Sequence, residues 1–159
     1  MLLTRETDYA LLCVLEVAKN GHRGAHDIAR RRGVSPSFLS NVVRTLTKAG
    51  ITVTRRGNGG GVSLARPASS ITVLEVVEAI QGELVVNACV CEPPQCVRQP
   101  GCPAYGLFVD VQKKMRALLD VTLEEVLAGS TSTQIAPTGL PTVADELRYR
   151  QLGNLDPAP

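Results

Sequence analysis

Four of the chain's five cysteines fall within fourteen consecutive residues, and this cluster has the clearest chemical meaning in the sequence. Cys91, Cys96 and Cys102 are separated by four and five residues, and Cys89 lies two positions before Cys91. Four prolines and a glycine lie between or beside them, so the segment can form neither a regular helix nor a central strand. We therefore expect an irregular loop whose thiolates turn toward one point, as in a metal or iron–sulfur site.

The cysteines alone leave the kind of site open. Four thiolates could hold zinc in a tetrahedral arrangement. The Cys-x-Cys spacing is unusual for structural zinc, and thiolates equally suit iron–sulfur clusters. The fifth cysteine, Cys13, lies among apolar residues, and we expect it to pack in the core.

The composition is that of a globular protein, with 44% hydrophobic residues in a chain of 159. No apolar run approaches the roughly 20 residues that span a bilayer, and no secretion signal is apparent. We therefore expect a cytoplasmic protein without membrane contact, in which clustered cysteines more often bind metal or sense redox state than form disulfides. The sequence has no Ser/His/Asp set, paired carboxylates or nucleotide-binding fingerprint, so we expect no enzyme.

The net charge of +2 is unevenly distributed. Residues 1–66 contain 11 Lys and Arg against 4 Asp and Glu, a net +7, whereas residues 67–159 contain 6 against 11, a net −5. A basic half on a near-neutral protein indicates a polyanion contact confined to that half. A solvated basic surface is the simpler alternative, and charge alone does not decide between them.

Three helices are expected in the basic half, over residues 4–20, 25–32 and 36–49. In the first, Leu11, Leu12, Leu15 and Ala18 form an apolar stripe with Asp8 at its margin. The third begins with Ser35 as its N-cap and a proline at its first position, and Gly50 ends it. The short turn over 33–35 between the second and third helices is typical of a helix-turn-helix.

A β-hairpin follows, with strands expected over 51–55 and 62–65 and a glycine-rich turn over 56–61. No Lys-Ser or Lys-Thr pair and no helix follow the glycines, which excludes a phosphate-binding loop. The fold class is therefore mainly α with a small β-wing: a winged helix-turn-helix.

This layout is typical of DNA binding, because the third helix can enter a major groove while the wing contacts the backbone or minor groove. A single exposed Ser or Asn is more often only solvated, but the cap, turn, helix and basic wing together favour DNA. The candidate contacts are Ser35, Ser37, Ser40, Asn41 and Arg44 from the helix, and Arg55, Arg56 and Asn58 from the wing.

The second half is expected to hold a sensor and a dimerisation element. Thr72 and Glu75 form a capping box that opens a helix to about residue 81. After the cysteine loop, Cys102 stands as an N-cap before a long helix that reaches about residue 122. A further capping box at 122–125 opens a short last helix ending near 129. Residues 130–159 are rich in Pro, Thr and Ser, and we expect them to form a mostly disordered tail with a helical turn near 142–152.

The long helix carries an apolar residue at intervals of four and three, which predicts a coiled-coil seam. We expect it to form a homodimer, since a helix-turn-helix protein usually reads two half-sites, although packing on its own domain is the alternative. The seam residues are Ala104, Phe108, Val111, Met115 and Leu118. The expected divisions are a DNA-binding domain over 1–82, a cysteine-rich loop over 83–103, dimerisation and short helices over 104–129, and the tail.

Several motifs in this order resemble the Rrf-two family of bacterial regulators over residues 1–129. Besides the three-cysteine loop, they are Asp8-Tyr9-Ala10-Leu11, Val34-Ser35, Leu46-x-x-Ala49-Gly50, Arg56-Gly57-x-Gly59-Gly60-Gly61 and Pro67-Ala68-x-x-Ile71-Thr72. The resemblance implies a winged-helix domain, a long dimerisation helix and a loop-bound iron–sulfur cluster, 4Fe-4S rather than 2Fe-2S.

Within the family, the cysteine spacing is similar to that of the NsrR repressors, which respond to nitric oxide. No histidine follows Cys102, where IscR-like relatives carry one. The resemblance implies three cysteine ligands, with Asp8 of the partner subunit as the fourth and Cys89 as the alternative. The expected function is a homodimeric iron–sulfur repressor that senses nitric oxide and binds a near-palindromic operator. Alternatives are a sensor of iron or cluster supply, as in IscR- and RirA-like relatives, and a zinc-stabilised structural or redox protein.

Overall fold

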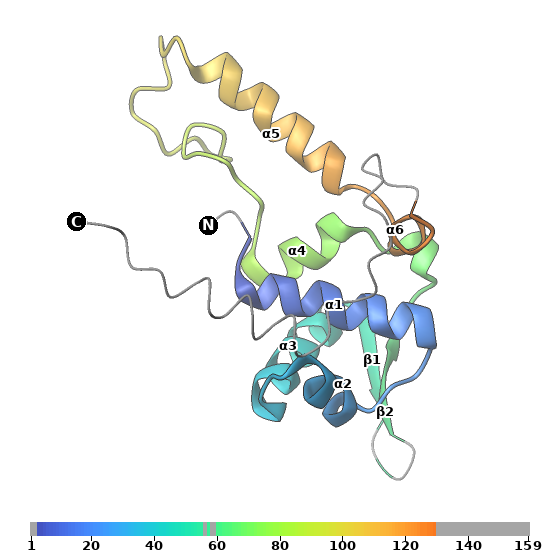
Figure 1. Ribbon diagram of the computed structural model, residues 1–159. Helices are drawn as coiled ribbons and strands as arrows, with labels where there is room; N and C mark the ends of the chain where they lie inside the picture. Colours follow the sequence, from blue (N-terminus) through green and yellow to red (C-terminus); the bar gives the residue numbers. More distant parts are fainter. Residues whose placement is uncertain (1–2, 56, 58–59, 130–159) are drawn as a thin grey trace, which may run out of the picture.

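The computed structural model describes residues 3–55, 57 and 60–129, which form a mainly helical fold with one small antiparallel sheet (Figure 1). This confirms the predicted fold class. The elements, in chain order, are α1 Arg5–Asn20, α2 Ala25–Arg32, α3 Pro36–Lys48, β1 Thr52–Arg55, β2 Gly61–Leu64, η1 Ala68–Ser70, α4 Val73–Gln81, α5 Tyr105–Leu119 and α6 Leu123–Leu127. The predicted tail over 130–159 and its helical turn lie outside the described residues.

Local signals account for the helix-turn-helix formed by α2 and α3. Gly33 ends α2 in the left-handed conformation, with φ of 63°, which costs glycine little. Two residues later the Ser35 hydroxyl accepts a hydrogen bond from the backbone N–H of Phe38, at 3.2 Å, and Pro36 opens α3. The chain therefore turns sharply between the two helices without leaving the N–H groups of α3 unpaired.

The wing is fixed to the helical body by a close backbone approach. β1 and β2 pair antiparallel, and Val62 also exchanges two backbone hydrogen bonds with Arg23, at 2.7 and 3.0 Å. A Cβ atom at Gly61 would lie only 2.2 Å from the carbonyl oxygen of Arg23. Only glycine fits here, so this residue sets the position from which the wing projects.

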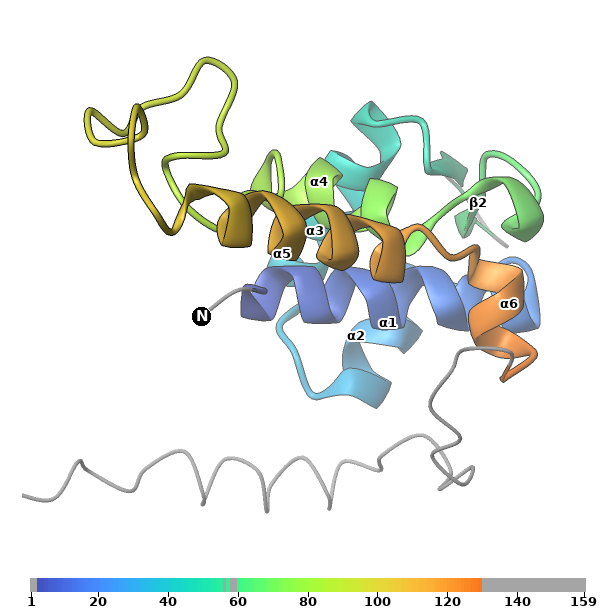
Figure 2. The same ribbon diagram turned by 90° about the horizontal axis from the view of Figure 1, so that it is seen from above.

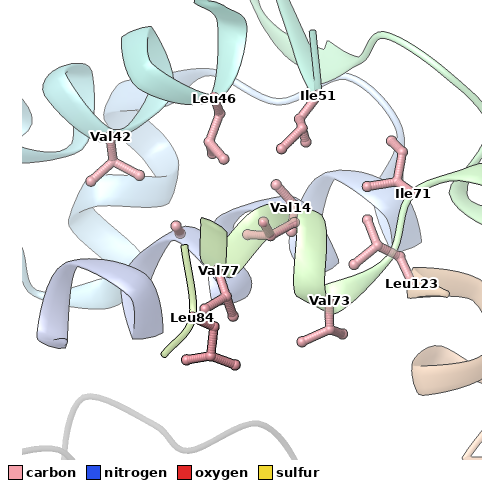
Figure 3. Close-up of a cluster of buried hydrophobic side chains, with 11 residues drawn as sticks. Val14, Val42, Leu46, Ile51, Ile71, Val73, Val77, Leu84 and Leu123 are labelled. Atoms are coloured by element: carbon pink, nitrogen blue, oxygen red, sulfur yellow. The ribbon is translucent and has the colours of Figure 1, made fainter. Parts of the chain in front are cut away.

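The core forms around α1, which contacts α2, α3, α4, α6 and the sheet. Figure 3 shows its larger cluster, which includes Val14, Val42, Leu46, Ile51, Ile71, Val77, Leu84 and Leu123. The predicted apolar stripe on α1 was wrong in its position. The buried face consists of Ala10, Cys13, Val14 and Val17, whereas Leu11, Leu12, Leu15 and Ala18 are half-buried. Neighbours approach α1 from several sides, so the smaller side chains occupy the closest contacts.

The long helix α5 begins later than predicted. Two backbone turns precede it, closed by hydrogen bonds from Cys102 N to Gln99 O and from Tyr105 N to Cys102 O. Cys102 is therefore not the N-cap; Ala104 is, and it makes no side-chain cap. The helix ends at Leu119, three residues earlier than expected.

α5 packs against α4 along one of its sides. Figures 1 and 2 show it running alongside the α1–α4 body, with the cysteine loop projecting beyond its N-terminal end. None of the α5 side chains is fully buried in the described chain. No helix among the residues that the structure describes is long and apolar enough to cross a membrane.

Both predicted capping boxes are present at the starts of α4 and α6. In the second, the Glu125 carboxylate accepts hydrogen bonds from the backbone N–H and hydroxyl of Thr122, each 2.8 Å long. These bonds favour the ionised carboxylate and lower the pKa of Glu125. The two boxes lie side by side, because Thr72 and Thr122 form an antiparallel bridge.

Candidate nucleic-acid interface and cysteine loop

The exposed face of α3 carries most of the predicted DNA contacts. Leu39, Val42, Val43 and Leu46 bury the opposite face against the domain, each at most 4% exposed. This orientation leaves a polar stripe along the helix open to solvent, with members at Ser37, Ser40, Asn41, Arg44 and Lys48.

Two polar pairs organise this stripe. Arg44 Nη2 donates a 3.0 Å hydrogen bond to Asn41 Oδ1, and both side chains are exposed. This bond orients the Asn41 amide and the Arg44 guanidinium relative to each other while both retain unused donors. Ser35 Oγ serves as the helix cap and lies 3.1 Å from Ser37 Oγ, so Ser35 has less hydrogen-bonding capacity left for DNA.

A groove of about 500 Å³ separates α3 from the wing. Three cationic side chains line it, Arg44 and Lys48 from α3 and Arg55 from β1. The remaining lining residues are Ala25, Ser40, Val43, Thr47, Thr54, Gly61 and Val62. The structure thus joins three of the predicted contacts, Ser40, Arg44 and Arg55, in one basic groove. Arg56 and Asn58, also predicted for the wing, lie outside the described residues.

Among the polar side chains of the groove, sequence reasoning missed three, Thr47, Lys48 and Thr54. The signal for Lys48 was available, because it follows Arg44 by four residues and so shares its helix face. Thr47 and Thr54 are brought together only by the way the hairpin folds back along α3, and a sequence pattern does not reveal this. A hydroxyl and an ammonium at these positions extend the phosphate-binding capacity of the groove.

Other basic residues contribute less to this surface. Arg32 is only 6% exposed and pairs with the buried Glu16 of α1, with Nη2 3.0 Å from Oε2. Arg31 binds the other oxygen of Glu16 at 3.2 Å, and Arg30 pairs with Asp27 on the surface of α2. The predicted excess of positive charge is therefore partly neutralised at α2, whereas the residues that line the α3–wing groove include three cations and no carboxylate.

The cysteine loop presents three accessible thiols and one buried thiol. Cys91, Cys96 and Cys102 are partly exposed, whereas Cys89 is 5% exposed, and none forms a disulfide. A hydrogen bond from Gln95 N to Ala88 O, at 3.0 Å, folds the loop back on itself. Among the residues that the structure describes, no three His, Cys, Asp or Glu side chains come together as a metal site. The expected convergence of the thiolates is therefore not present in the single chain.

The donor set still fits the chemistry of a thiolate-bound metal centre. Three accessible sulfurs lie on an irregular loop that lacks the constraints of a helix or strand, so it can close around a group that binds them. Asp8 is exposed on the first turns of α1 rather than set into an apolar stripe, so its carboxylate is open to a second molecule. Figures 1 and 2 place this end of α1 and the cysteine loop at the same end of the molecule.

Cys13 has no place in this donor set. Its side chain is fully buried, and this burial, with the nearby Glu16 carboxylate, raises the pKa of the thiol to about 12. Arg32 opposes that shift but does not cancel it. A thiol with this pKa stays protonated at neutral pH, and only the thiolate is a good metal ligand. The structure therefore supports the expected packing role.

Comparison with known proteins identifies relatives over most of the chain. The Rrf2 family, described as iron-dependent transcriptional regulators, matches residues 3–129. Protein aau3 of Rhizobium meliloti is 36% identical over 123 residues, covering 76% of this chain and 79% of its own. The HTH-type transcriptional regulator IscR of Klebsiella pneumoniae is 33% identical over 131 residues, covering 80% of each.

Solved structures show the same fold. CymR of B. subtilis superimposes with a TM-score of 0.69 at 24% identity, covering 80% of this chain and 97% of CymR. T. potens IscR superimposes with a TM-score of 0.62 at 24% identity, covering 86% of this chain and 93% of its own. The family comprises regulators rather than enzymes, in agreement with the open basic groove. Its model spans the winged domain, the cysteine loop and α5, and the chain therefore belongs to the Rrf2 family of transcriptional regulators.

Proposed function

We propose that the protein is a homodimeric repressor whose DNA affinity depends on an iron–sulfur cluster. The observation that carries this proposal is the basic groove between α3 and the wing, on a chain that also presents three accessible thiols. Residues 1–82 would read DNA, 83–103 would hold the cluster, and 104–129 would join two subunits. The relationship to IscR regulators supports DNA binding by the first of these segments.

The DNA contacts divide by chemistry. Asn41 and Arg44, oriented by their mutual hydrogen bond, can make bidentate contacts to base edges in the major groove. Lys48, Arg55 and the wing would bind phosphates. A gel-shift titration at several salt concentrations tests this assignment, with a near-palindromic promoter fragment against a scrambled one. Equal affinity for both fragments at moderate salt contradicts a specific repressor.

The cluster would be held by Cys91, Cys96 and Cys102, with Asp8 of the partner subunit as the fourth ligand. The exposure of Asp8 and the burial of Cys89 favour the aspartate over the fourth cysteine. When bound, a 4Fe-4S cluster would supply iron that small molecules can attack. Anaerobic purification followed by absorption spectroscopy and iron and sulfide assays tests this. Stoichiometric zinc without sulfide would support the structural or redox alternative.

Dimerisation would occur through α5. Leu107, Val111 and Leu118 are 63%, 42% and 68% exposed and lie along one side of the helix, an arrangement that costs free energy if left in water. A second copy of α5 would cover this stripe. It would also bring the partner's Asp8 within reach of the cysteine loop.

Nitric oxide is the proposed signal. A carboxylate is a harder donor than a thiolate and suits an iron–sulfur centre less well, so it is the ligand that a competing small molecule displaces first. The second candidate is a sensor of iron or cluster supply, favoured by the description of the family as iron-dependent. Titrating nitric oxide or an iron chelator into loaded protein separates the two signals.

A further inference from the structure

The first residues of the cysteine loop are held between α4 and α5 by a set of side-chain hydrogen bonds. Gln112 of α5 uses both ends of its amide: Oε1 accepts from Val86 N at 2.9 Å, and Nε2 donates to Leu84 O at 2.5 Å. Glu78 of α4 accepts from Leu84 N at 3.2 Å. The Leu84 side chain is 1% exposed and belongs to the main core.

The same two helices are also joined by an ion pair. Arg116, one turn beyond Gln112, places Nη1 2.5 Å from Glu78 Oε1 and Nη2 3.4 Å from Oε2. Because an α-helix turns by about 100° per residue, Gln112 and Arg116 lie on the side of α5 away from the exposed Leu107 and Leu118. α5 therefore has one side that faces its own chain, where Met115 and Leu119 pack against the core beside the polar contacts, and one apolar side facing outward. We call Gln112, Glu78 and Arg116 the loop clasp.

A second connection runs from α4 to α1. Gln81 Oε1, at the end of α4, accepts from Thr7 Oγ1 at 2.8 Å and from Thr4 N at 3.3 Å. Thr7 is fully buried and immediately precedes Asp8. The cysteine loop is thus connected to the first turn of α1. The connection runs through the hydrogen bonds of the loop clasp, along the helix α4, and through the hydrogen bonds of Gln81.

We propose that Gln112 is a positioning residue that couples the cysteine loop to the DNA-binding domain. Its amide fixes the loop to α5 at Leu84 and Val86, so a change in the loop shifts α4, Gln81 and the start of α1 together. An apolar side chain could fill the same space, but only an amide can both accept a hydrogen bond from Val86 N and donate one to Leu84 O. This inference rests on the proposed cluster-dependent function and adds the residue that transmits the state of the loop. Chains of packed side chains and hydrogen bonds can carry coupling between distant sites when they have two discrete arrangements.

The test compares Q112A, Q112E and the control K113A, which changes an exposed neighbour on the same helix. Q112E keeps the acceptor for Val86 N–H but faces the Leu84 carbonyl with a carboxylate, so it should fail as Q112A does. The first readout is hydrogen exchange of cluster-free protein. The Val86 amide should exchange about fivefold faster in Q112A, as the loss of a hydrogen bond predicts, and unchanged in K113A.

The second readout is the ratio of DNA dissociation constants between cluster-free and cluster-loaded protein. Coupling between sites typically changes affinity about 5- to 150-fold. In Q112A and Q112E this ratio should fall to within about threefold of one, with iron content per subunit unchanged, while K113A should match the original protein.

Three outcomes contradict the inference. The Q112A ratio could stay at the original value, the Val86 amide could remain protected, or folded Q112A could lose its iron, which would make Gln112 part of the cluster site rather than a connection. Failure of the proposed function looks different: the original protein itself would bind no iron and sulfide, or would bind DNA equally with and without them.

Discussion

At the level of single residues, the side chains of the groove differ in what they can recognise. Arg44 is held by Asn41 at 3.0 Å on the exposed face of α3, whereas Arg55 is the last residue of β1, beside the glycine-rich turn. A guanidinium oriented beside an amide suits base edges, and one on the wing suits phosphate.

We therefore predict that Arg44→Ala loses about 1–3 kcal/mol of discrimination at particular base pairs. Arg55→Ala should weaken binding to all sequences equally and reduce the salt slope by about 0.9, the value for one phosphate contact. Competition gel shifts with single-base operator variants, repeated over a salt series, measure both quantities. Lys19→Ala, on the exposed last turn of α1 outside the groove, is the control. Indistinguishable profiles for the two arginine variants would contradict this division.

Cys13 gives a second prediction, on pH. Its pKa is about 12 in the folded chain, against the ordinary 9.0 that applies once the chain unfolds. Below pH 9 both states keep the proton, so the buried thiol adds its full stability there. Above pH 9 the unfolded chain releases the proton first, so the free energy of unfolding falls as pH rises toward 12, by up to about 1.4 kcal/mol per pH unit.

Urea unfolding of the original protein and Cys13→Ala, from pH 8 to pH 10.5, isolates this effect because other titrating groups are common to both. The difference in stability should be constant to about pH 9 and then shrink. Native-state alkylation gives an independent check: Cys91, Cys96 and Cys102 should react in cluster-free protein while Cys13 stays protected. If the free energies of unfolding of the two proteins changed in parallel with pH, Cys13 would ionise as easily in the folded chain as in the unfolded chain.

At the level of elements, α1 and α2 are joined by a buried ion pair. Glu16 and Arg32 are each about 6% exposed, and removing one partner leaves an uncompensated buried charge. Glu16→Ala should therefore cost about 3–5 kcal/mol of stability. Asp27→Ala, which breaks the exposed pair with Arg30, should cost less than about 1 kcal/mol. Equal urea unfolding midpoints for Glu16→Ala and Asp27→Ala would mean that the buried ion pair stabilises the fold no more than the exposed pair does.

The exposed side of α5 supports the fourth prediction. Leu118 is 68% exposed in the single chain, so Leu118→Glu should leave the fold of one subunit intact. In a dimer it would bury carboxylates at the helix contact, and light scattering should show a monomer. Lys113→Glu makes a charge change on another side of the same helix and should remain dimeric. A Leu118→Glu dimer as tight as the original would place the interface elsewhere.

Some elements could be predicted and others could not, and the range of the interactions explains the difference. Ser35, Thr72 and Thr122 identify helix starts because a cap is a contact within three residues. The start of α5 was misplaced because backbone hydrogen bonds around Cys102, rather than its side chain, shape the approach. The Glu16–Arg32 pair was missed because it spans sixteen residues and neither partner belongs to a motif.

The α5 seam shows the same limit. Of its predicted positions, Phe108 and Met115 are half-buried in their own chain, whereas Val111 and Leu118 face outward. The spacing revealed an apolar helix but not how its apolar residues divide between its own chain and the proposed second subunit. The sequence also predicted that the cysteines converge, and among the described residues they do not come together as a metal site; the proposed fourth ligand belongs to a second subunit.

At the level of the whole molecule, the proposed link between the signal and DNA runs through Asp8. The residue is exposed, follows the buried Thr7 that binds Gln81, and lies in the first turn of the helix around which the DNA-binding domain packs. If the partner's cysteine loop binds this carboxylate, releasing it frees the first turn of α1. The α3 helices of the two subunits would then lose their fixed separation, and a palindromic operator would no longer fit both.

We predict that nitric oxide at low molar excess over the proposed cluster abolishes specific DNA binding while light scattering still shows a dimer, because the proposed α5 contact does not involve Asp8. Asp8→Ala should retain part of its iron and sulfide yet bind the operator with the same weakened affinity before and after nitric oxide, and Cys89→Ala should behave like the original protein. Gel shifts across a nitric oxide titration measure this. DNA binding that survives nitric oxide but disappears on iron chelation would identify an iron-supply sensor. If Cys89→Ala removed the cluster while Asp8→Ala changed nothing, the fourth ligand would be the buried thiol. The helix α1 would then contribute no ligand to the cluster, and the proposed coupling through Asp8 would be wrong.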